Sequence, residues 1–528
     1  MIGRARLAGL LDRQVSLVLR RWEGYKLRHP ETAQRMAPVL RGLWRMAVRR
    51  RSHLAGLRPI PLIGAGPSEI AALMAADKVD ARHTVVEPDA RIGARVEYVF
   101  LVPDRGVLLV GWLCDPRGHL TSVRVRTRTS VSDDIRARMS RFPRSDVIET
   151  FRSWLGGGSQ RKPGFTCFVE IPDVSSEEVT GSLSIELATK GRSWTLEPRP
   201  MVGADGDEPL AAIRSLLTVV PPGDATILNE HVGPAIAGMW RTKEDEAQVI
   251  EVGRPPSRAR VSVVVPVYGR YDLIEYQMAL FANDPDIRGA ELIYVIDDPR
   301  ITQDVVTLCR SIEPIFKVPC RLVLCTSNHG YARATNLGAG VAHGELLLLM
   351  NSDVIPRAPG WLSALADAYS ELPEPGALGP RLLYPDGSLQ HAGMSFVQAP
   401  WLPGLWLNDH PGKGLPASRV VAREPVRVPA ITGACLMISR QLYEGVGGLD
   451  EGYVVGDFED SDLCLKLLER GHHSWVAPWI ELYHVERMSV ALTGDPGWRQ
   501  SITLYNAWRH TRRWGHLLPK LESGAVDA

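Results

Sequence analysis

The chain has 528 residues, of which 45% are hydrophobic and 23% charged, an ordinary globular composition that does not imply long disordered regions. Domains usually span about 100–200 residues, so we expect two or three. The net charge of +1 conceals an asymmetry, because the first 58 residues contain 14 Lys or Arg and three acidic residues (+11), leaving −10 for the rest. This pattern indicates a basic N-terminal arm on a mildly acidic body, and we expect no nucleic-acid partner for that body.

Cysteine usage and hydropathy bear on the location of the protein. The seven cysteines include no Cys-x-x-Cys pair, which argues against a disulfide framework and against a zinc site. No apolar run approaches the roughly 18 residues of a membrane span, and no cleavable signal pattern opens the chain. The sequence therefore predicts a cytoplasmic protein that neither spans a membrane nor is secreted.

Residues 1–60 are predicted to form an amphipathic helical arm. Leu7, Leu11 and Val18 fall on one side of a helical wheel with arginines opposite, and the pattern repeats from residue 36 to residue 47. One interpretation is a helical hairpin lying on the anionic inner face of the cell membrane. The other is a helix pair docked on the body with a solvated basic face.

Residues 84–205 are predicted to form a β-sandwich-like domain, because short β-rich runs alternate with turn signals such as Pro103–Gly106. This domain is either a glycan-binding module or a structural spacer. Trp112 and Trp194 either stack on sugar rings or belong to the core. The predicted strands are Val96–Val102, Val107–Cys114, Ser122–Thr129, Phe165–Ile171 and Ser182–Ala188.

Residues 206–258 are typical of a helical, Pro-rich linker, and residues 259–516 alternate strand and helix patterns, as in a parallel α/β sheet. The first strand is predicted at Val261–Val267 and the first helix at Asp272–Phe281. Ligands of such sheets bind beyond the carboxyl ends of the strands. Further strands are predicted at Glu291–Ile296, Arg321–Cys325 and Glu345–Met350.

Eight motifs in this part of the chain occur in a characteristic order. They are VSVVVPVYGR, VIDD, NHGYARATNLG, LLLLMNSDVIP, ITGACLMISR, GGLDEGY, GDFEDSDLCLKLLERG and YHVERMS. Together they resemble an inverting glycosyltransferase of family 2, in particular its rhamnosyltransferase-like branch. The resemblance covers about half of the chain and implies a Rossmann-like GT-A fold.

The resemblance also implies ligands and partners. The donor would be a UDP- or dTDP-linked sugar, with rhamnose on a thymidine nucleotide as one candidate. The acceptor would be a glycan or a lipid-linked glycan of cell-envelope polysaccharide biosynthesis. The cofactor would be Mn²⁺ or Mg²⁺, which bridges phosphates and offsets charge on the leaving diphosphate.

Two residues are predicted to hold this cation. Asp353 follows an apolar strand, at the place where a carboxylate can meet a diphosphate. The family motif is Asp-x-Asp, whereas this chain has Asn351-Ser352-Asp353, so one ligand charge is missing. His484 corresponds to the histidine that completes the family's metal site, and an imidazole ligand favours Mn²⁺. An Asx turn at Asp353 and a structural His484 are the alternatives.

The cluster Glu459-Asp460-Ser461-Asp462 is predicted to begin a helix, where the helix dipole favours ionised carboxylates. Inverting transfer needs a base that takes the proton of the acceptor hydroxyl. The resemblance assigns this role to Asp460, with Glu459 orienting the acceptor. The alternatives are a simple N-cap role for Asp460 and a first-turn charge for Asp462.

Donor-binding residues are expected at the carboxyl ends of the strands, by resemblance to the family. Arg333 suits a phosphate because of its fixed fork, although a surface arginine is equally consistent with its place. Gly433 would let the backbone approach the sugar. The full predicted set is Pro266, Val267, Tyr268, Asp297, Asp298, Asn328, Gly330, Arg333, Asn336, Ser352 and Gly433.

Two other classes of function remain open from the sequence. A non-catalytic carbohydrate- or nucleotide-binding scaffold with a GT-A fold is favoured by Asn351 alone. A nucleotidyltransferase shares the diphosphate and metal chemistry but leaves the carboxylates at Glu459 and Asp460 without a role. The product separates the classes, because glycosyl transfer releases a nucleoside diphosphate and nucleotidyl transfer releases pyrophosphate.

Overall fold

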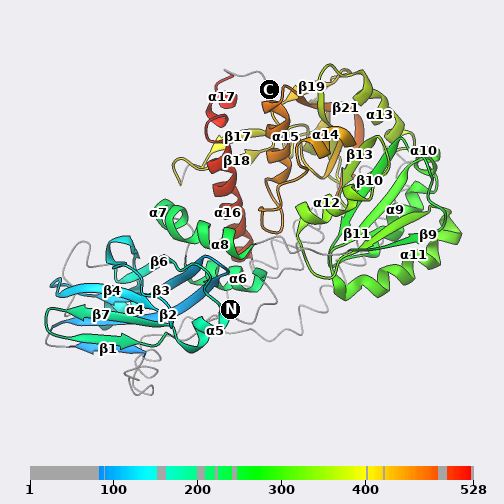
Figure 1. Cartoon of the computed structure of the whole chain (residues 1–528). Coiled ribbons are helices and arrows are strands. Elements are labelled where there is room, and N and C mark those ends of the chain that lie inside the picture. The colour runs from blue at the N-terminus through cyan, green and yellow to red at the C-terminus, as the bar shows by residue number, and fades with distance from the viewer. Residues whose placement is uncertain are drawn as a thin grey trace, which may run out of the picture.

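We describe a computed structural model of the chain (Figure 1), with element labels as in that figure. The predicted helical arm lies outside the described residues. The structure describes residues 83–87, 90–151, 162–198, 209–220, 224–240, 247–399, 402–419, 422–485 and 496–524.

The N-terminal region contains two antiparallel sheets that share one core. One sheet has the order β1-β2-β3-β6-β5 and the other β4-β7-β8. Val96 and Leu109 of the first sheet pack in one cluster with Val123 and Ile185 of the second. The strands are β1 (Thr84–Glu87), β2 (Ile92–Val102), β3 (Gly106–Cys114), β4 (Leu120–Arg126), β5 (Ser140–Phe142), β6 (Gly164–Glu170), β7 (Ser184–Thr189) and β8 (Ser193–Leu196), with helices η1 (Arg136–Arg138), α4 (Ser145–Thr150) and α5 (Ser176–Gly181) between them.

Trp112 and Trp194, the two tryptophans considered above, both take part in packing. Trp112 is only 3% exposed, and its ring lies 5.2 Å from that of Phe151. Trp194 is half-buried and packs against the cluster between the two sheets. Trp112 is therefore a core residue and not a sugar-stacking platform.

The segment predicted to be a linker forms a helical layer. It contains α6 (Pro209–Val219), α7 (Ala225–Ile227), the π-helical turn η3 (Leu228–Val232) and α8 (Gly233–Met239). Ile213 and Ile236 of this layer pack with Phe100 of β2 and with Tyr505 of the C-terminal helix α16 (Pro496–Trp514) in a single cluster. The layer joins the two parts of the protein (Figure 1).

The C-terminal region is built on a mixed sheet. Within the described residues its order is β14-β21-β15-β20-β13-β10-β11-β12-β9, with β16 paired to β15 and β19 paired to β21. Strands β13, β10, β11 and β12 are mutually parallel. The bounds are β9 (Gln248–Val252), β10 (Val261–Val267), β11 (Glu291–Ile296), β12 (Cys320–Leu324), β13 (Leu346–Met350), β14 (Val354–Pro356), β15 (Pro375–Leu383), β16 (Leu389–His391), β19 (Val426–Val428), β20 (Cys435–Ser439) and β21 (His473–His484).

The α/β architecture predicted for this region is confirmed. Strands β10 and β11 and helix α9 (Asp272–Phe281) have the predicted bounds. The sheet nevertheless begins before residue 259, because β9, which lies in the predicted linker, pairs antiparallel with β12. Its Gln248, Val249 and Glu251 are exposed, as at an open sheet edge, and so lack the apolar signal of the central strands.

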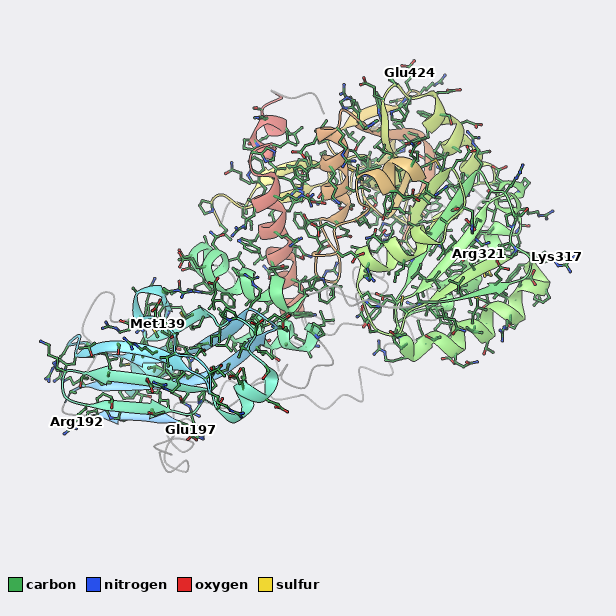
Figure 2. The ribbon with its side chains drawn as sticks, in the orientation of Figure 1. Met139, Arg192, Glu197, Lys317, Arg321 and Glu424 are labelled. Atoms are coloured by element: carbon green, nitrogen blue, oxygen red, sulfur yellow. The ribbon has the colours of Figure 1, made fainter. Side chains whose placement is uncertain are left out.

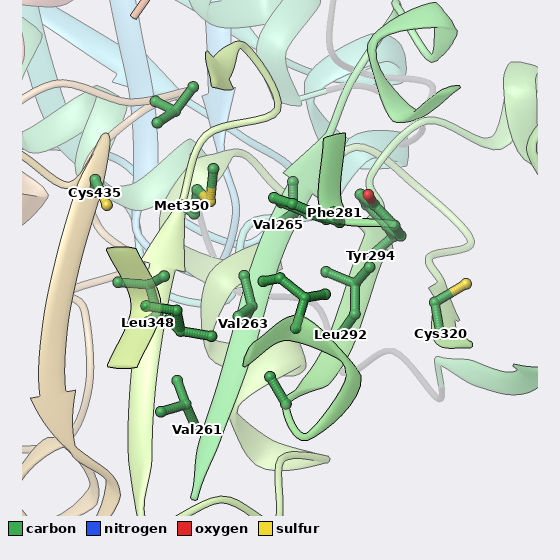
Figure 3. Packing of buried hydrophobic residues seen from close by; sticks show 14 of the residues in the cluster. Val261, Val263, Val265, Phe281, Leu292, Tyr294, Cys320, Leu348, Met350 and Cys435 are labelled. Carbon is green, nitrogen blue, oxygen red and sulfur yellow. The ribbon is translucent and has the colours of Figure 1, made fainter. Parts of the chain in front are cut away.

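The central strands are apolar on both faces because helices cover both. Val263 and Val265 of β10 pack with Phe281 of α9 and with Leu292 of β11 (Figure 3), while Val264 packs on the opposite face. Such burial produces continuous apolar runs. The other helices are α10 (Pro285–Arg288), η4 (Pro299–Ile301), α11 (Thr302–Phe316), α12 (Tyr331–Gly340), α13 (Trp361–Glu371), α14 (Arg440–Gly445), α15 (Glu459–Glu469) and α17 (Leu518–Glu522).

A charged cluster lies where β11 and β12 begin, at the amino ends of the strands. Glu291 is fully buried and pairs with Arg321, which Figure 2 labels at this end of the sheet. The carboxylate also accepts from the Ser262 hydroxyl and, at 2.7 Å, from the main-chain N–H of His343. These bonds satisfy the buried charge of Glu291, so the cluster has a structural role at the amino ends of the strands.

An insertion follows β15. Asp386–Ser388 forms a hairpin turn, with the Tyr384 N–H bonded to the Ser388 carbonyl oxygen at 2.9 Å. Beyond β16, the strands β17 (Ser395–Gln398) and β18 (Trp406–Asp409) form a separate two-stranded ribbon, followed by η5 (Ala417–Arg419).

The seven cysteines are buried, and none of them forms a disulfide. Among the described helices, none has the length and apolar character needed to cross a lipid bilayer.

Candidate functional site

Asp353 and His484 lie together at one edge of the sheet. The Oδ1 atom of Asp353 is 3.3 Å from Nε2 of His484, and both side chains are buried. Strands β14 and β21 produce this contact, because Val354 pairs with His484 in their antiparallel register. The N–H of Val485 also donates to the Asp353 carbonyl oxygen at 3.1 Å. The residues predicted as metal ligands are therefore adjacent.

Gln277 holds the turn that carries Asp353. This α9 residue is fully buried, and its amide nitrogen donates to the carbonyl oxygens of Asn351 at 3.2 Å and Val354 at 3.1 Å. The Tyr294 hydroxyl donates to Gln277 Oε1 at 3.2 Å. The bonds from Gln277 to Val354 and from Tyr294 to Gln277 are buried. A buried hydrogen bond is stronger than an exposed one, so these bonds hold the turn firmly. Sequence periodicity did not single out Gln277, although a glutamine on the apolar face of α9 is a recognisable signal.

The donor set at this edge fits a divalent cation. Asp353 offers a hard carboxylate oxygen and His484 an imidazole, a combination that suits Mn²⁺. Nδ1 of His484 is buried without a hydrogen-bond partner among the described residues. A buried polar atom of this kind calls for a ligand or a water molecule.

Glu459 and Asp460 occupy the first turn of α15, as predicted. The N-cap is Phe458, so Asp460 is not an N-cap. Asp460 Oδ2 accepts from the N–H of Gly433 at 2.9 Å and Oδ1 from the N–H of Ser461 at 2.7 Å. Glu459 is buried, and its Oε2 has no hydrogen-bond partner in the described part of the chain.

Burial dominates the electrostatics of these carboxylates. It raises the pKa of Glu459 well above its usual value, with the charge of Asp460 adding to the effect. Burial also raises the pKa of Asp460, against the two backbone hydrogen bonds that it accepts. The sequence argument that the helix dipole keeps the pair readily ionised is therefore wrong in direction, because desolvation outweighs the dipole.

Asp462, the third carboxylate, has a structural environment. It is fully buried, accepts from the Trp514 indole at 2.8 Å and lies 3.1 Å from Arg513 Nη1. Lys466 Nζ lies 3.5 Å away on the same helix. Asp462 therefore ties α15 to α16 and is more than a first-turn charge.

Tyr331 connects the carboxylates to the strand ends. Its hydroxyl donates to the Gly433 carbonyl oxygen at 2.7 Å, and a Cβ at Gly433 would lie 3.2 Å from that hydroxyl and 3.3 Å from Asp460 Cβ. The next residue, Ala434, accepts from the N–H of Asn351 at 2.9 Å. A short backbone path therefore runs from Asp460 to the turn that carries Asp353.

Burial and the charges of Glu459 and Asp460 raise the pKa of Tyr331 well above its usual value, so its hydroxyl stays protonated. The sequence did not indicate this role, because the contacts of Tyr331 with Gly433 and the two carboxylates are made across distant segments.

His391 adds a neutral imidazole beside Gly433. It is buried, and burial lowers its pKa well below the usual value, with smaller electrostatic contributions from His410, His484 and Lys413. Its Nε2 faces the N–H of Thr432 at 3.3 Å, and its Nδ1 lies 3.0 Å from Nδ1 of His410. A ring whose Nε2 accepts carries its proton on Nδ1, so we assign the donor role in the histidine pair to His391.

The predicted nucleotide-binding carboxylates take different roles. Asp297 is buried and accepts from the main-chain N–H groups of His329 at 2.8 Å and Gly330 at 2.9 Å, so it shapes the loop before α12. Asp298 is 1% exposed and pairs with Arg300 at 2.8 Å. This pair and backbone hydrogen bonds lower the pKa of Asp298 against the effect of its burial.

Tyr268 and Pro266, both half-buried, lie at the end of β10 beside the buried Val267. The guanidinium of Arg300 lies 5.7 Å from the centre of the Tyr268 ring. Asn328 accepts from the N–H of Gly330 at 3.1 Å. These residues, with Asp297, surround the carboxyl ends of β10 and β11, where the sequence predicted a nucleotide.

Arg333 and Asn336 both contact Glu451. Arg333 Nη1 lies 3.1 Å from the carboxylate of Glu451, and the Asn336 amide donates to Glu451 and to the Leu449 carbonyl oxygen, each at 2.9 Å. The Oδ1 atom of Asn336 accepts from the Tyr443 hydroxyl at 2.5 Å. The structure therefore places these two predicted donor residues against the loop before α15 and not among the strand ends.

Asp297 also belongs to a group with a metal-type donor set. Its carboxylate, the Cys325 thiol and the His329 imidazole offer atoms within 4.8 Å of one another. Both oxygens of Asp297 already accept backbone hydrogen bonds, and the group lies at the ends of β11 and β12.

Residues 262–447 match the model of glycosyl transferase family 2. The chain is 31% identical over 233 residues to protein y4gI of Sinorhizobium fredii (43% of this chain, 25% of the relative). It is 28% identical over 283 residues to the O-antigen biosynthesis protein RfbC of Myxococcus xanthus (51% of this chain, 21% of the relative). Aligned regions thus span a quarter or less of these two relatives.

A third relative is matched over most of its length. The chain is 32% identical over 223 residues to the N-acetylglucosaminyl-diphospho-decaprenol L-rhamnosyltransferase of Mycobacterium tuberculosis, covering 37% of this chain and 69% of the relative. With the family match and the parallel strands that carry the motifs, this similarity shows that the chain belongs to glycosyl transferase family 2 and is related to its rhamnosyltransferases.

Proposed function

We propose that the protein is an inverting glycosyltransferase that moves a sugar from a nucleoside diphosphate to a hydroxyl group of a glycan or lipid-linked acceptor. The observation that supports this proposal most is the arrangement around Gly433. Its N–H is held by Asp460, and the neighbouring Ala434 is bonded to the turn carrying Asp353, which contacts His484. The carboxylate proposed as the base and the pair proposed to bind a cation are thus connected by a short hydrogen-bonded stretch of backbone.

In the proposed reaction Asp460 takes the proton of the acceptor hydroxyl as its oxygen attacks the anomeric carbon. The bond from that carbon to the diphosphate oxygen breaks on the opposite face, which inverts the configuration. The two N–H groups of Gly433 and Ser461 fix the carboxylate. Its raised pKa makes it a stronger base than an exposed aspartate.

The residues around Asp460 have supporting roles. Glu459 lies in the same helical turn and orients the acceptor, while Asp353 and His484 would hold a divalent cation. When bound, the cation would neutralise charge on the diphosphate. Tyr268, Asp297 and their neighbours at the ends of β10 and β11 would receive the nucleoside.

A donor panel tests this function. The purified full-length protein is incubated with UDP-, GDP- and dTDP-linked sugars, with Mn²⁺ or Mg²⁺, and with lipid-diphosphate glycan acceptors. The panel includes dTDP-rhamnose and N-acetylglucosaminyl-diphosphoprenol, in view of the mycobacterial relative's name. Release of the nucleoside diphosphate and formation of glycosylated acceptor support the proposal. Pyrophosphate would indicate nucleotidyl transfer, and no turnover on the full panel would indicate a scaffold.

The Asp460→Asn variant should lose about 100- to 10,000-fold in transfer rate, the usual contribution of a general base. Its matched control is Asp367→Asn. Asp367 is an exposed carboxylate on α13 whose pair with Arg260 is at the surface, where ion pairs contribute little. Comparable losses in both variants would remove the support for Asp460 as the base.

We also propose that the basic arm, residues 1–60, brings the enzyme to an anionic cytoplasmic membrane face. Removal of residues 1–58 should abolish binding to vesicles that contain anionic lipid, and unchanged binding would reject this part of the proposal.

A further inference from the structure

The backbone that leads into Glu459 has an unusual conformation. Val455, Asp457 and Phe458 have φ angles of 65°, 94° and 77°, although L-residues rarely adopt positive φ and a β-branched residue there is a genuine outlier. A backbone of this kind persists only when its surroundings impose it, and such positions gather at functional sites. We call residues 447–458 the approach loop, because it ends where the two carboxylates begin.

Asn506 of α16 binds this loop on both sides of Val455. Its Oδ1 accepts from the N–H of Val454 at 3.0 Å, and its Nδ2 donates to the carbonyl oxygens of Val454 at 3.1 Å and Gly456 at 3.0 Å. Asn506 is fully buried. All three of these side-chain hydrogen bonds are therefore made to the backbone of the loop, on either side of Val455, the first of its residues with a positive φ angle.

Other side chains of α16 continue the contact. The Thr503 hydroxyl donates to Asp457 at 2.8 Å, and Arg509 pairs with Asp450 at 2.8 Å. Arg513 and Trp514 then bind Asp462 of α15. Figure 1 shows α16 alongside α15. The same helix therefore holds the approach loop and the helix that carries the carboxylates.

The opposite side of the loop is held by α12 and by the helical layer. The N–H of Tyr331 donates to the Val455 carbonyl oxygen at 2.7 Å, and Arg333 pairs with Glu451. The Trp240 indole, just after α8, donates to the Glu451 carbonyl oxygen at 2.9 Å. These contacts fix where the loop lies, whereas Asn506 fixes how its backbone turns between residues 454 and 456.

We propose that Asn506 is a positioning residue for transfer, which sets the orientation of Glu459 and Asp460 by imposing the left-handed backbone that precedes them. The proposal rests on the proposed function, because it assigns the two carboxylates a role in the reaction. Asn506 itself touches neither substrate. Its loss should reduce turnover while nucleotide-sugar binding at the ends of β10 and β11 persists, because Asn506 contacts neither strand end.

Two variants test this role in the full-length protein. Asn506→Leu has a similar size and makes none of the three bonds. Asn506→Asp keeps the acceptor for the Val454 N–H and replaces the donor by a second oxygen facing two carbonyl oxygens. The control is Trp508→Phe, which removes a part-buried hydrogen bond from α16 to Asn229 of the helical layer; a phenyl ring keeps apolar contact with the cluster that Trp508 shares with Phe458. Thermal melting and circular dichroism identify folded variants.

With the donor found for the wild-type enzyme, both Asn506 variants should lose about 10- to 100-fold in kcat, since displacement of a reacting group by about 1 Å has effects of this size. The KM for the donor should stay within about twofold. The acid limb of the kcat profile should move to lower pH, because a loosened loop admits water to Asp460 and reduces the burial that raises its pKa. The control should keep the wild-type profile.

Hydrogen exchange supplies a readout that does not need turnover. Amides of residues 454–461 should exchange faster in both Asn506 variants and at the wild-type rate in Trp508→Phe, with β10 and β11 unchanged in all three. Folded Asn506 variants that keep the wild-type kcat and exchange would overturn the positioning role. An inactive wild-type protein whose variants still show the localised exchange would reject the proposed function and leave the structural part of the inference standing.

Discussion

His484 Nε2 lies 3.3 Å from Asp353 Oδ1, although the two residues are far apart in the sequence. Their adjacency follows from the register of β14 and β21, in which His484 pairs with Val354. A carboxylate and an imidazole placed so closely in a buried setting either bond to each other or share a cation. Nε2 is the His484 atom that faces the carboxylate, so a shared cation would be held between Nε2 and Asp353.

Replacing either residue should weaken metal binding. We expect Asp353→Asn and His484→Ala to lower the affinity for Mn²⁺ at least about tenfold, because loss even of a supporting residue usually has an effect of 10- to 100-fold. Titration of free Mn²⁺ by electron paramagnetic resonance measures this without any sugar donor. His516→Ala, an exposed histidine near the end of the chain, is the control, and equal affinities in all variants would contradict the assignment.

Gln277 should influence metal binding at the same site, because it holds the turn that carries Asp353. Gln277→Met has a similar size but cannot form the Gln277 hydrogen bonds. The carbonyl oxygens of Asn351 and Val354 and the Tyr294 hydroxyl would each lose this partner. We expect a loss of about 1–3 kcal/mol in the free energy of unfolding, measured with urea, together with weaker Mn²⁺ binding. A variant that is destabilised yet binds Mn²⁺ as the wild type does would confine Gln277 to stability.

Glu459 should reduce stability at neutral pH. Burial raises its folded-state pKa well above the usual value, so the folded protein holds the proton more tightly than the unfolded chain. Stability then falls as pH rises above the unfolded pKa. Glu459→Gln should therefore raise the free energy of unfolding at pH 8 by about 1–3 kcal/mol.

This gain should vanish below about pH 4, where the wild-type side chain is protonated in both states. Denaturant titrations at pH 4 and pH 8 provide the comparison. A gain that is independent of pH would mean that packing, and not ionisation, is responsible.

The helical layer should be needed for a stable catalytic region. A fragment of residues 247–528 keeps β9 but loses α6 to α8, which cover Tyr505, Trp508 and Phe458 in one cluster. Exposure of these large side chains removes hydrophobic stabilisation of about 25 cal/mol per Å². We expect a lower Tm and stronger binding of a hydrophobic dye than for residues 209–528. Equal melting curves would show that the layer is only a spacer.

The sequence was most informative where side-chain pattern and burial coincide. Strand β10 and helix α9 were located to the residue because both faces of the strand and one face of the helix are covered. Strand β9 was assigned to the linker because it lies at the sheet edge and is largely exposed, so its stability comes from backbone pairing with β12. Backbone pairing leaves no residue pattern that identifies it.

The same distinction applies to the site. Resemblance to the family singled out Asp353, Asp460 and His484, and the positions of Asp353 after an apolar strand and of Asp460 at a helix start agreed with it. It also placed Arg333 and Asn336 in the predicted donor set, and only the structure shows that both contact Glu451. The sequence of a helix does not show which distant segment its polar side chains will contact.

The sequence by itself determined the family, the α/β pattern and the types of groups that carry the chemistry, since these depend on local periodicity and on residue identity. Tertiary structure alone decided the protonation tendency of Glu459 and Asp460 and the roles of Gln277, Tyr331 and Asn506. The physical reason is that desolvation and buried hydrogen bonds depend on neighbours from distant segments, and those neighbours are brought together only when the sheet, α12 and α16 have packed.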